Sequence, residues 1–240
     1  MKRCLTSLLI LLLLLPVGPA TSVAAEPEMR PALVGDGPHA LINVINVNRL
    51  VKKGQGDGLL MFTAYVSVSG HVLNYSAYRA TPDSDALQEE VKNALPVCRF
   101  LPAIYHGRRV DVYFGGTVLF TVTDGKPHLR VYANQNRQDI QEENDFIAPQ
   151  LVAGSFTWAG ISRDPGLLKA RAYHQRGAMQ FSLTIDANGN VNAVKTVAED
   201  PPGFGFGAAY EKIYAGAKWI PGFRNGQPVD STFDYTDYFR

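Results

Sequence analysis

The side chains that most often carry chemistry in proteins are widely separated in this sequence. There are five histidines: His39, His71, His106, His128 and His174. They form no i,i+4 pair and no cluster with cysteine or acidic residues, so the sequence predicts no metal site and no cofactor. It contains no Gly-x-Ser-x-Gly motif and no recognisable Ser/His/Asp arrangement. We therefore expect a protein that is not an enzyme.

Two short stretches resemble ligand-binding loops. Residues 186–190 (Asp-Ala-Asn-Gly-Asn) begin like a calcium loop, but the glycine comes early and position 197, where a bidentate glutamate is due, is valine. A hairpin turn is the favoured interpretation. Residues 201–207 (Pro-Pro-Gly-Phe-Gly-Phe-Gly) precede a predicted helix, as phosphate loops do, but no Lys-Ser/Thr pair follows them. We interpret them as a lead-in to the helix, with a peptide-contact loop as the alternative.

The clearest pattern in the chain is a repeat. Phe100-Leu101-Pro102 and Trp219-Ile220-Pro221 each precede a turn with glycine and then a Val-Asp pair. The offset of 119 residues holds without a gap from residues 58–121 onto residues 177–240, with twelve identities. Most of these are glycine, proline or core apolar residues, which fix backbone conformation and packing. We therefore predict two copies of one small domain, here called the first and second repeats.

Each repeat is predicted to start with a β-hairpin and continue into a helix. Apolar residues alternate along residues 60–68 and 179–185, and Ser69-Gly70 and Asn188-Gly189 supply the turns. Apolar residues then recur at helical spacing over 87–98 and 206–217. A last strand closes each unit, and Gly115-Gly116 is expected to bend it in the first repeat. The predicted fold class is α+β, with two units that each have a small antiparallel sheet of about three strands covered by one helix.

Residues 1–25 have the pattern of a secretory signal peptide. Lys2 and Arg3 precede an apolar run over residues 5–15, which is short for a membrane span, and small residues lead to Ala25. We expect export with cleavage near Ala25. The alternative is an N-terminal anchor that is retained in the membrane.

Without residues 1–25 the chain keeps 21 of its 23 basic residues and all 22 acidic residues, a net charge of −1. Nothing in that balance indicates nucleic acid as a partner. Cys98 is then the one remaining cysteine, so an internal disulfide is excluded. It falls on the apolar stripe of the predicted helix, which favours a core residue over a reactive or intermolecular thiol.

We divide the rest of the chain by composition and by the repeat. We predict a flexible segment over residues 26–38, a first domain over 39–125, a connecting segment over 126–160 and a second domain over 161–240. A strand is expected at residues 40–47, another at 129–133 and a short helix at 166–173.

The order of hairpin, helix, Phe/Trp-x-Pro and Asn-Gly resembles the C-terminal domain of TonB, the periplasmic end of the energy transducer for outer-membrane receptors. Residues 177–239 are the closer match, and residues 58–122 are a more diverged copy. The resemblance implies a periplasmic protein-binding or adaptor protein whose last strand accepts an extended partner segment, main chain to main chain. By position, this edge comprises Val229, Ser231, Phe233, Tyr235, Asp237 and Phe239.

The sequence departs from the family pattern in two respects. No histidine precedes His39 to match the family's membrane-embedded histidine, and the 15 prolines form no spacer run. We therefore expect a TonB-like periplasmic protein that binds a protein or peptide segment, with an outer-membrane receptor of TonB-dependent transport among the candidates. The alternatives are a transducer anchored in the inner membrane and facing the periplasm, and a self-assembling structural protein of the cell envelope that forms homodimers through its edge strands.

Overall fold

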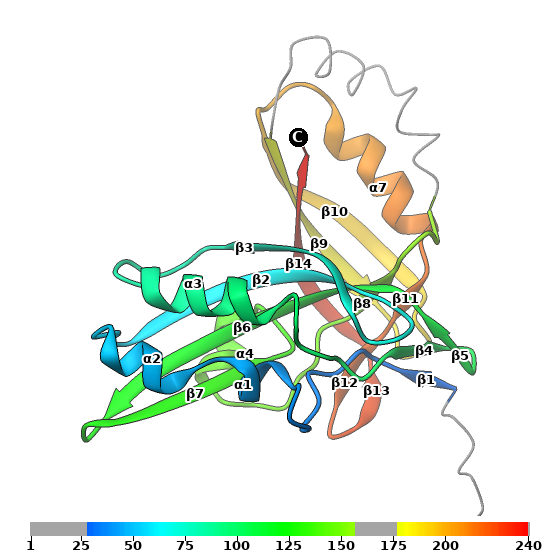
Figure 1. Ribbon diagram of the computed structural model, residues 1–240. Helices are drawn as coiled ribbons and strands as arrows, with labels where there is room; N and C mark the ends of the chain where they lie inside the picture. Colours follow the sequence, from blue (N-terminus) through cyan, green and yellow to red (C-terminus); the bar gives the residue numbers. More distant parts are fainter. Residues whose placement is uncertain (1–27, 157–176, 240) are drawn as a thin grey trace, which may run out of the picture.

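Two antiparallel sheets, each backed by helices, form the two lobes of the computed structural model, which describes residues 28–156 and 177–239 (Figure 1). The elements up to the connection between the lobes are β1 (Met29–Arg30), α1 (Leu41–Val44), α2 (Val47–Lys52), β2 (Gly58–Val66), β3 (Val72–Tyr78), α3 (Asp85–Ala94), β4 (Ala103–Tyr105), β5 (Arg108–Val110), β6 (Val112–Thr123), β7 (Lys126–Tyr132), α4 (Arg137–Gln141) and β8 (Gln150–Val152). The later elements are β9 (Gly177–Ile185), β10 (Val191–Asp200), α7 (Phe206–Gly216), β11 (Trp219–Ile220), β12 (Gly222–Arg224), β13 (Gln227–Val229) and β14 (Ser231–Phe239). The fold is therefore of the predicted α+β class.

The first lobe is built on a sheet of six strands. Its order is β11-β8-β6-β2-β3, and β7 pairs with the far end of β6. As predicted, alternate residues of β2 are buried, from Leu60 to Val66, and they form the core together with Leu87 and Val91 of α3. β3 is one edge of this sheet, and its seven residues carry no charge.

The second lobe has a sheet of three strands in the order β10-β9-β14, with α7 packed against it. Met179, Phe181, Leu183 and Ile185 of β9 are fully buried and face Tyr210 and other core residues of α7. The prediction of about three strands fits this sheet. The first lobe has more because β7, β8 and β11 join it, and these strands lie outside the repeated hairpin, helix and last strand.

The two repeats adopt the same strand pairing. β2 pairs with β6 from Gly58↔Phe120 onward, and β9 pairs with β14 from Gly177↔Phe239 onward, which is the same register displaced by 119 residues. The hairpin turns are also alike. The carboxylate of Asp111 accepts a hydrogen bond from the Val68 N–H (2.7 Å), and that of Asp230 accepts one from the Ala187 N–H (2.7 Å).

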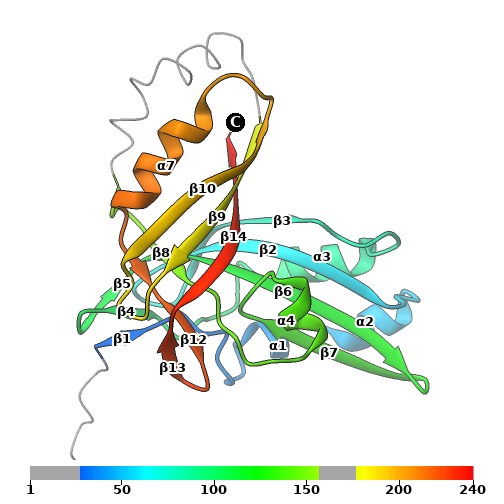
Figure 2. The same ribbon diagram turned by 180° about the vertical axis from the view of Figure 1, so that it is seen from behind.

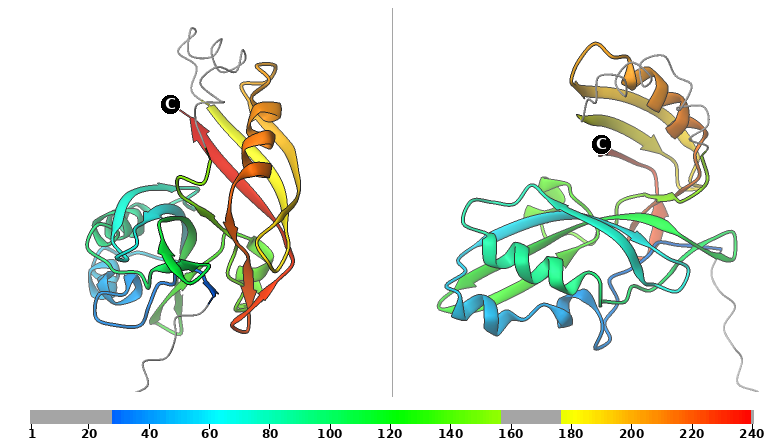
Figure 3. Two further views of the ribbon diagram at one scale, coloured as in Figure 1. Left: turned by 90° about the vertical axis from the view of Figure 1, so that its right-hand side faces the viewer. Right: turned by 45° about the horizontal axis from the view of Figure 1, so that its top comes forward.

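A short ribbon joins the two lobes. β11 pairs with β8 through Trp219↔Leu151 and Ile220↔Gln150. Because successive side chains of a strand point to opposite faces, Trp219 and Leu151 lie in the core of the second lobe, while Ile220 and Val152 lie in that of the first. Figure 3 shows the two lobes meeting at this ribbon.

The structure differs from the sequence prediction at residues 40–47, which were expected to form a strand. They form α1 and the start of α2 instead. Leu41 of α1, Ile45 directly after α1 and Leu50 of α2 are buried, and the Asn46 side chain accepts a hydrogen bond from the Arg49 N–H at the start of α2. Burial of these residues and this N-cap outweigh the β propensity of the branched residues.

Residues 26–38 were predicted to be flexible, but part of this segment is held firmly. β1 pairs with β4, Leu33 bridges to Leu101, and Ala32 is fully buried. The main chain of Ala32 forms two hydrogen bonds with the buried side-chain amide of Gln150, at 2.7 and 2.9 Å. These contacts hold residues 29–33, whereas residues 35–38 are exposed and Gly35 has a positive φ (75°).

β6 continues through Gly115 and Gly116, where the sequence predicted a bend, and its pairing with β2 has no register shift there. A Cβ atom at Gly116 would lie 2.6 Å from the Phe62 ring, and one at Gly115 would lie 3.4 Å from the side chain of Gln135. The two glycines thus make room on the two faces of the sheet.

The predicted helix at residues 166–173 lies outside the described residues, and the predicted domain boundaries remain predictions. Among residues 28–156 and 177–239, no helix combines the length and the apolar character that a membrane crossing needs.

Candidate functional site

A cleft of about 810 Å³ lies between the two lobes. One wall is the face of the first sheet that points away from α3, including Thr63, Ser76 and Tyr113, together with the segment that follows β7. The other wall is β14, which contributes residues 233–237. The last strand of the second repeat is therefore placed inside a cleft whose opposite wall is the first lobe.

β14 is the edge strand of its sheet (Figure 2). It pairs with β9 along its whole length from Ser231 to Phe239. Within the described parts of the chain, no other strand pairs with it and no backbone hydrogen bond reaches its second edge. An edge of this kind presents a row of main-chain donors and acceptors to any extended segment that enters the cleft.

The residues that present this free edge can be identified from the hairpin. The Asp186 N–H donates to the Asn190 carbonyl (3.0 Å), so the main-chain groups of Asp186 point toward β10. Since these groups alternate along an antiparallel strand, those of Ile185 point toward β14 and bond its partner Ser231. Alternation along β14 then turns the N–H and C=O groups of Thr232, Asp234, Thr236 and Tyr238 away from β9, and Asp234 and Thr236 line the cleft.

In the first repeat the equivalent edge is already occupied. The edge of β6 that faces away from β2 pairs with β8 at Val112 and Tyr113, and with β7 from Thr117 onward. Both added strands run antiparallel to β6. The first repeat thus shows that this edge accepts extended segments, whereas in the second repeat the edge lines a cleft.

The six residues predicted for the partner-binding edge lie at or near it, but most of their side chains point elsewhere. Phe233 and Tyr235 pack toward α7 in the second core, and Tyr214 donates a hydrogen bond to Asp237 (2.6 Å). Ser231 is on the same face of β14. Val229 belongs to β13 and pairs with Gly222, while Phe239 pairs with Gly177 and its side chain is not described.

The sequence prediction named alternate residues of this strand, and it stays a prediction; the structure shows only where their side chains and main-chain groups lie. Apolar side chains mark the face that packs on the helix, and main-chain groups of those same residues bond β9. The neighbouring polar residues, Thr232, Asp234 and Thr236, carry the free main-chain groups. The Thr184–Thr232 hydroxyl contact at 3.0 Å, on the face opposite α7, is consistent with this alternation. The polar half of the period-two pattern was the signal that could have found them.

Tyrosines from both lobes line the cleft next to Asp237. Burial raises the pKa of Tyr214 and of Tyr235 well above the usual value, and the nearby phenol and carboxylate groups add to this shift. Burial and the charge of Asp237 also raise the pKa of Tyr113, which comes from the first lobe. These phenols are therefore neutral at physiological pH and act as polar groups and apolar surface at the same time.

The segment after β7 completes the first-lobe wall. The Gln135 amide donates to the carbonyl oxygens of Phe62 (2.8 Å) and Gly116 (3.3 Å), and its oxygen accepts from the Tyr78 hydroxyl (2.7 Å). The buried Asn134 side chain donates to the Phe146 carbonyl (2.7 Å). These bonds fix the wall to the sheet, so the cleft has one rigid side formed by the first lobe.

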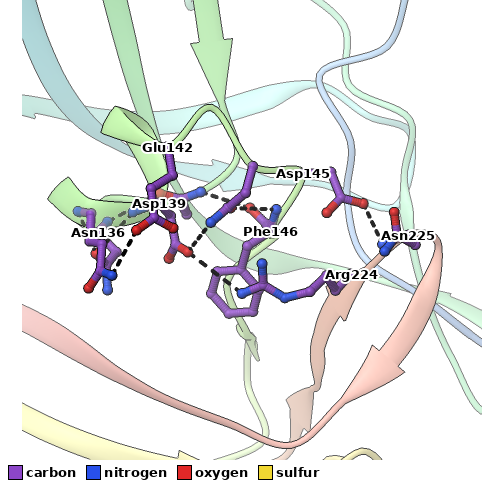
Figure 4. Close-up of polar contacts among 10 residues, drawn as sticks. Asn136, Asp139, Glu142, Asp145, Phe146, Arg224 and Asn225 are labelled. Atoms are coloured by element: carbon purple, nitrogen blue, oxygen red, sulfur yellow. Dashed lines mark hydrogen bonds and ion pairs between the residues drawn. The ribbon is translucent and has the colours of Figure 1, made fainter.

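The β12–β13 hairpin of the second repeat reaches back to the first lobe. Phe223 bridges to Ile147, and the Arg224 guanidinium lies 5.0 Å from the centre of the Phe146 ring and 3.6 Å from the Asp139 carboxylate. The Asn225 N–H also donates to the Asp145 carboxylate (Figure 4). These contacts, together with the β8–β11 ribbon, hold the two walls of the cleft in place.

In the two stretches that resemble ligand-binding loops, carboxylates of the chain itself accept main-chain N–H groups. The Glu199 carboxylate accepts the N–H groups of Phe204, Gly205 and Phe206, so the amides that begin α7 are capped from within the chain. Asp186 accepts from the Asn188 and Asn190 N–H groups as part of the predicted hairpin turn.

Cys98 is fully buried, and burial raises the pKa of its thiol to about 11, which supports the core interpretation. Over the described ranges, no three His, Cys, Asp or Glu side chains come together as a metal site.

The chain was also compared with known proteins. No family model, no curated protein and no solved structure matches it.

Proposed function

We propose that this chain is a binding protein for an extended polypeptide segment, which adds as a strand to the free edge of β14 inside the cleft. The observation that carries the proposal is the contrast between the repeats. The edge of β6 holds β7 and β8, whereas the equivalent edge of β14 has no strand on it within the described residues and faces an open cleft. By analogy with β7 and β8, the segment would run antiparallel to β14.

The repeat architecture and this edge support the wider reading of the chain as two tandem units of the TonB C-terminal type. On that reading the protein is a periplasmic adaptor, and an outer-membrane receptor is one candidate source of the segment. The proposal rests on the sequence motifs and on the strand order of each repeat, and it assigns no enzymatic activity.

The test uses the full chain and a library of random twelve-residue peptides displayed on phage. Thr236→Pro removes a main-chain N–H from the free edge of β14 while leaving the bonds to β9 in place. Thr236→Val is the matched control, because it changes the side chain and keeps the N–H. We expect the wild type and Thr236→Val to select overlapping peptides and Thr236→Pro to lose them.

Amide hydrogen exchange measured with a selected peptide gives a second readout. Added protection is expected at Thr232, Asp234 and Thr236, while the intervening amides are already protected by β9. Peptides that bind all three proteins equally, without this alternation, would exclude strand addition. Protection of the same amides on raising the concentration of the chain alone would instead identify a second copy as the occupant, as the self-assembly alternative requires.

A further inference from the structure

The arginines of the described residues fall into two groups. In the first group, the side chain has a hydrogen bond, an ion pair or another contact. This group comprises Arg30, Arg49, Arg99, Arg109, Arg130 and Arg224. In the part of the chain that the structure describes, the side chains of three arginines make no such contact: Arg79, Arg108 and Arg137. Two of these three, Arg79 and Arg137, line the cleft.

Arg79 and Arg137 belong to the same wall. Arg79 directly follows Tyr78 at the end of β3, and Arg137 begins α4 two residues after Gln135. The Tyr78 hydroxyl donates to the Gln135 side chain (2.7 Å), so the two arginines flank one contact on the first-lobe side. Both side chains are exposed, and Arg79 has a left-handed backbone (φ 47°), which an arginine adopts only at a cost.

The charges of the opposite wall have the other sign. β14 contributes Asp234 and Asp237 to the cleft, and neither forms an ion pair with Arg79 or Arg137 in the described residues. An occupant between these walls therefore meets guanidinium groups on the side of the first lobe and carboxylates on the side of β14. Guanidinium groups bind carboxylates through paired hydrogen bonds, and more strongly where water is partly excluded.

We propose that the segment bound at β14 presents aspartate or glutamate side chains toward the first lobe, and that Arg79 and Arg137 receive them on that wall. This inference rests on the proposed function and names the chemistry of the partner. It also gives the first lobe a part in recognition, although its own last strand is covered by β7 and β8.

The test compares peptide selections on three full-length proteins. These are the wild type, the double variant Arg79→Gln/Arg137→Gln and the matched control Arg108→Gln, which removes the third unpaired arginine away from the cleft. With the same random library, peptides from the wild type and the control are expected to contain at least about twice the input frequency of Asp and Glu. The double variant is expected to lose this excess.

A selected acidic peptide then gives the affinity by fluorescence anisotropy. We expect the double variant to bind about three- to thirtyfold more weakly at low salt, and the difference to shrink as salt is raised, since exposed ion pairs are modest and screened. Circular dichroism checks that each variant folds. A wild-type selection without acidic excess, or an excess that persists in the double variant, would overturn the inference.

Two results separate the role of the arginines from strand addition itself. Peptides that depend on the Thr236 N–H but show no acidic excess would leave strand addition standing and remove the role of the arginines. Acidic peptides that bind Thr236→Pro as well as they bind the wild type would show an anion-binding surface without strand addition, which contradicts both.

Discussion

Trp219 and Ile220 are consecutive residues of β11, and both side chains are fully buried, but they lie in different hydrophobic cores. Trp219 contacts Tyr214 and Phe233 in the second lobe, while Ile220 belongs to the core of the first. Because the two side chains of β11 point to opposite faces, the stability of the first lobe depends on Ile220, a residue of the second repeat. β11 also fixes the position of β14 relative to the wall that it faces.

Ile220→Ala should destabilise the first lobe although the residue lies in the second repeat. Loss of a buried isoleucine costs about 2–5 kcal/mol in the free energy of unfolding. Leu101→Ala is the matched control: Leu101 is the equivalent residue of the first repeat, and its side chain is 43% exposed. We expect a change below about 1 kcal/mol there. Denaturant unfolding measures both, and hydrogen exchange in β2 and β6 should report the loss for Ile220→Ala. Equal effects of the two substitutions would contradict the assignment of Ile220 to the first core.

Gly116→Ala should destabilise the protein, whereas Gly115→Ala should be tolerated. A methyl group at Gly116 would meet Phe62 at 2.6 Å and Phe114 at 2.7 Å, and both rings are fully buried. Such overpacking costs about 1–3 kcal/mol. At Gly115 the nearest atom is 3.4 Å away, which is an ordinary contact. Thermal unfolding of the two variants tests this difference. A larger loss of stability in Gly115→Ala than in Gly116→Ala would contradict it and show that Gln135 cannot move away from a methyl group at Gly115.

Gln150→Leu removes the side-chain amide that bonds the main chain of Ala32. Gln150 is 1% exposed and Ala32 is fully buried, so the N–H and C=O of Ala32 would be left without these partners. Each unsatisfied buried group costs about 1–3 kcal/mol, and we expect a loss of about 2–5 kcal/mol in total. Gln138→Leu, at an exposed position of α4, serves as the control and should change stability by less than about 0.5 kcal/mol. Increased proteolysis near residues 29–34 in Gln150→Leu alone would localise the effect.

Stability should fall at alkaline pH because of the buried phenols. The pKa of Tyr214 is raised in the folded state, so the folded protein binds this proton more tightly than the unfolded chain, whose tyrosines titrate near pH 10. The associated stability is fully present below about pH 10 and is lost as the pH rises above it. Tyr65, whose pKa is raised to about 12 by burial and by its bond to Asp111, contributes in the window from about pH 10 to 12.

Tyr214→Phe is the variant that tests this dependence. It removes the hydrogen bond to Asp237 and should cost about 1–2 kcal/mol at pH 7, but its stability should decline less steeply between pH 10 and 12. Urea unfolding at a series of pH values measures both effects. Tyr75→Phe, at an exposed position, is expected to keep the wild-type slope. If the stability of Tyr214→Phe declined with pH as steeply as that of the wild type, Tyr214 would not contribute to the loss of stability at alkaline pH.

Much of each repeat could be predicted because its signals are local. The alternation in β2 and β9, the turns at Gly70 and Gly189 and the apolar stripes of α3 and α7 are all readable within about ten residues, and the structure has each of these elements. The 119-residue offset also predicted the second set of elements from the first. Short-range periodicity and turn chemistry suffice where hydrophobic burial and local geometry agree.

The remaining features depend on contacts between distant residues. The residues that surround Gln150 in the sequence do not indicate that its side-chain amide bonds the main chain of Ala32. Those that surround Gly115 do not indicate that its lack of a side chain makes room for Gln135. The strand at 40–47 was predicted wrongly because branched residues have β propensity, while the burial of Leu41, Ile45 and Leu50 depends on core residues that are distant in the sequence. At the site, the sequence predicted a partner-binding edge on the last strand. Which residues of β14 turn their main chain outward follows from its pairing with β9, and local patterns do not show that pairing.

β3 and β10 are both edge strands, and they differ in charge and in the regularity of their pairing. β10 carries Lys195, Glu199 and Asp200, and its pairing shifts register twice. β3 has no charge along residues 72–78 and exposes Leu73 to 63% of its full area. Charge and bulges discourage edge-to-edge aggregation; β3 has one register shift, between its pairs with Tyr65 and Val66, but no charge. We therefore expect contacts between copies at high concentration to involve β3 more than β10, on the lobe whose last strand is already covered.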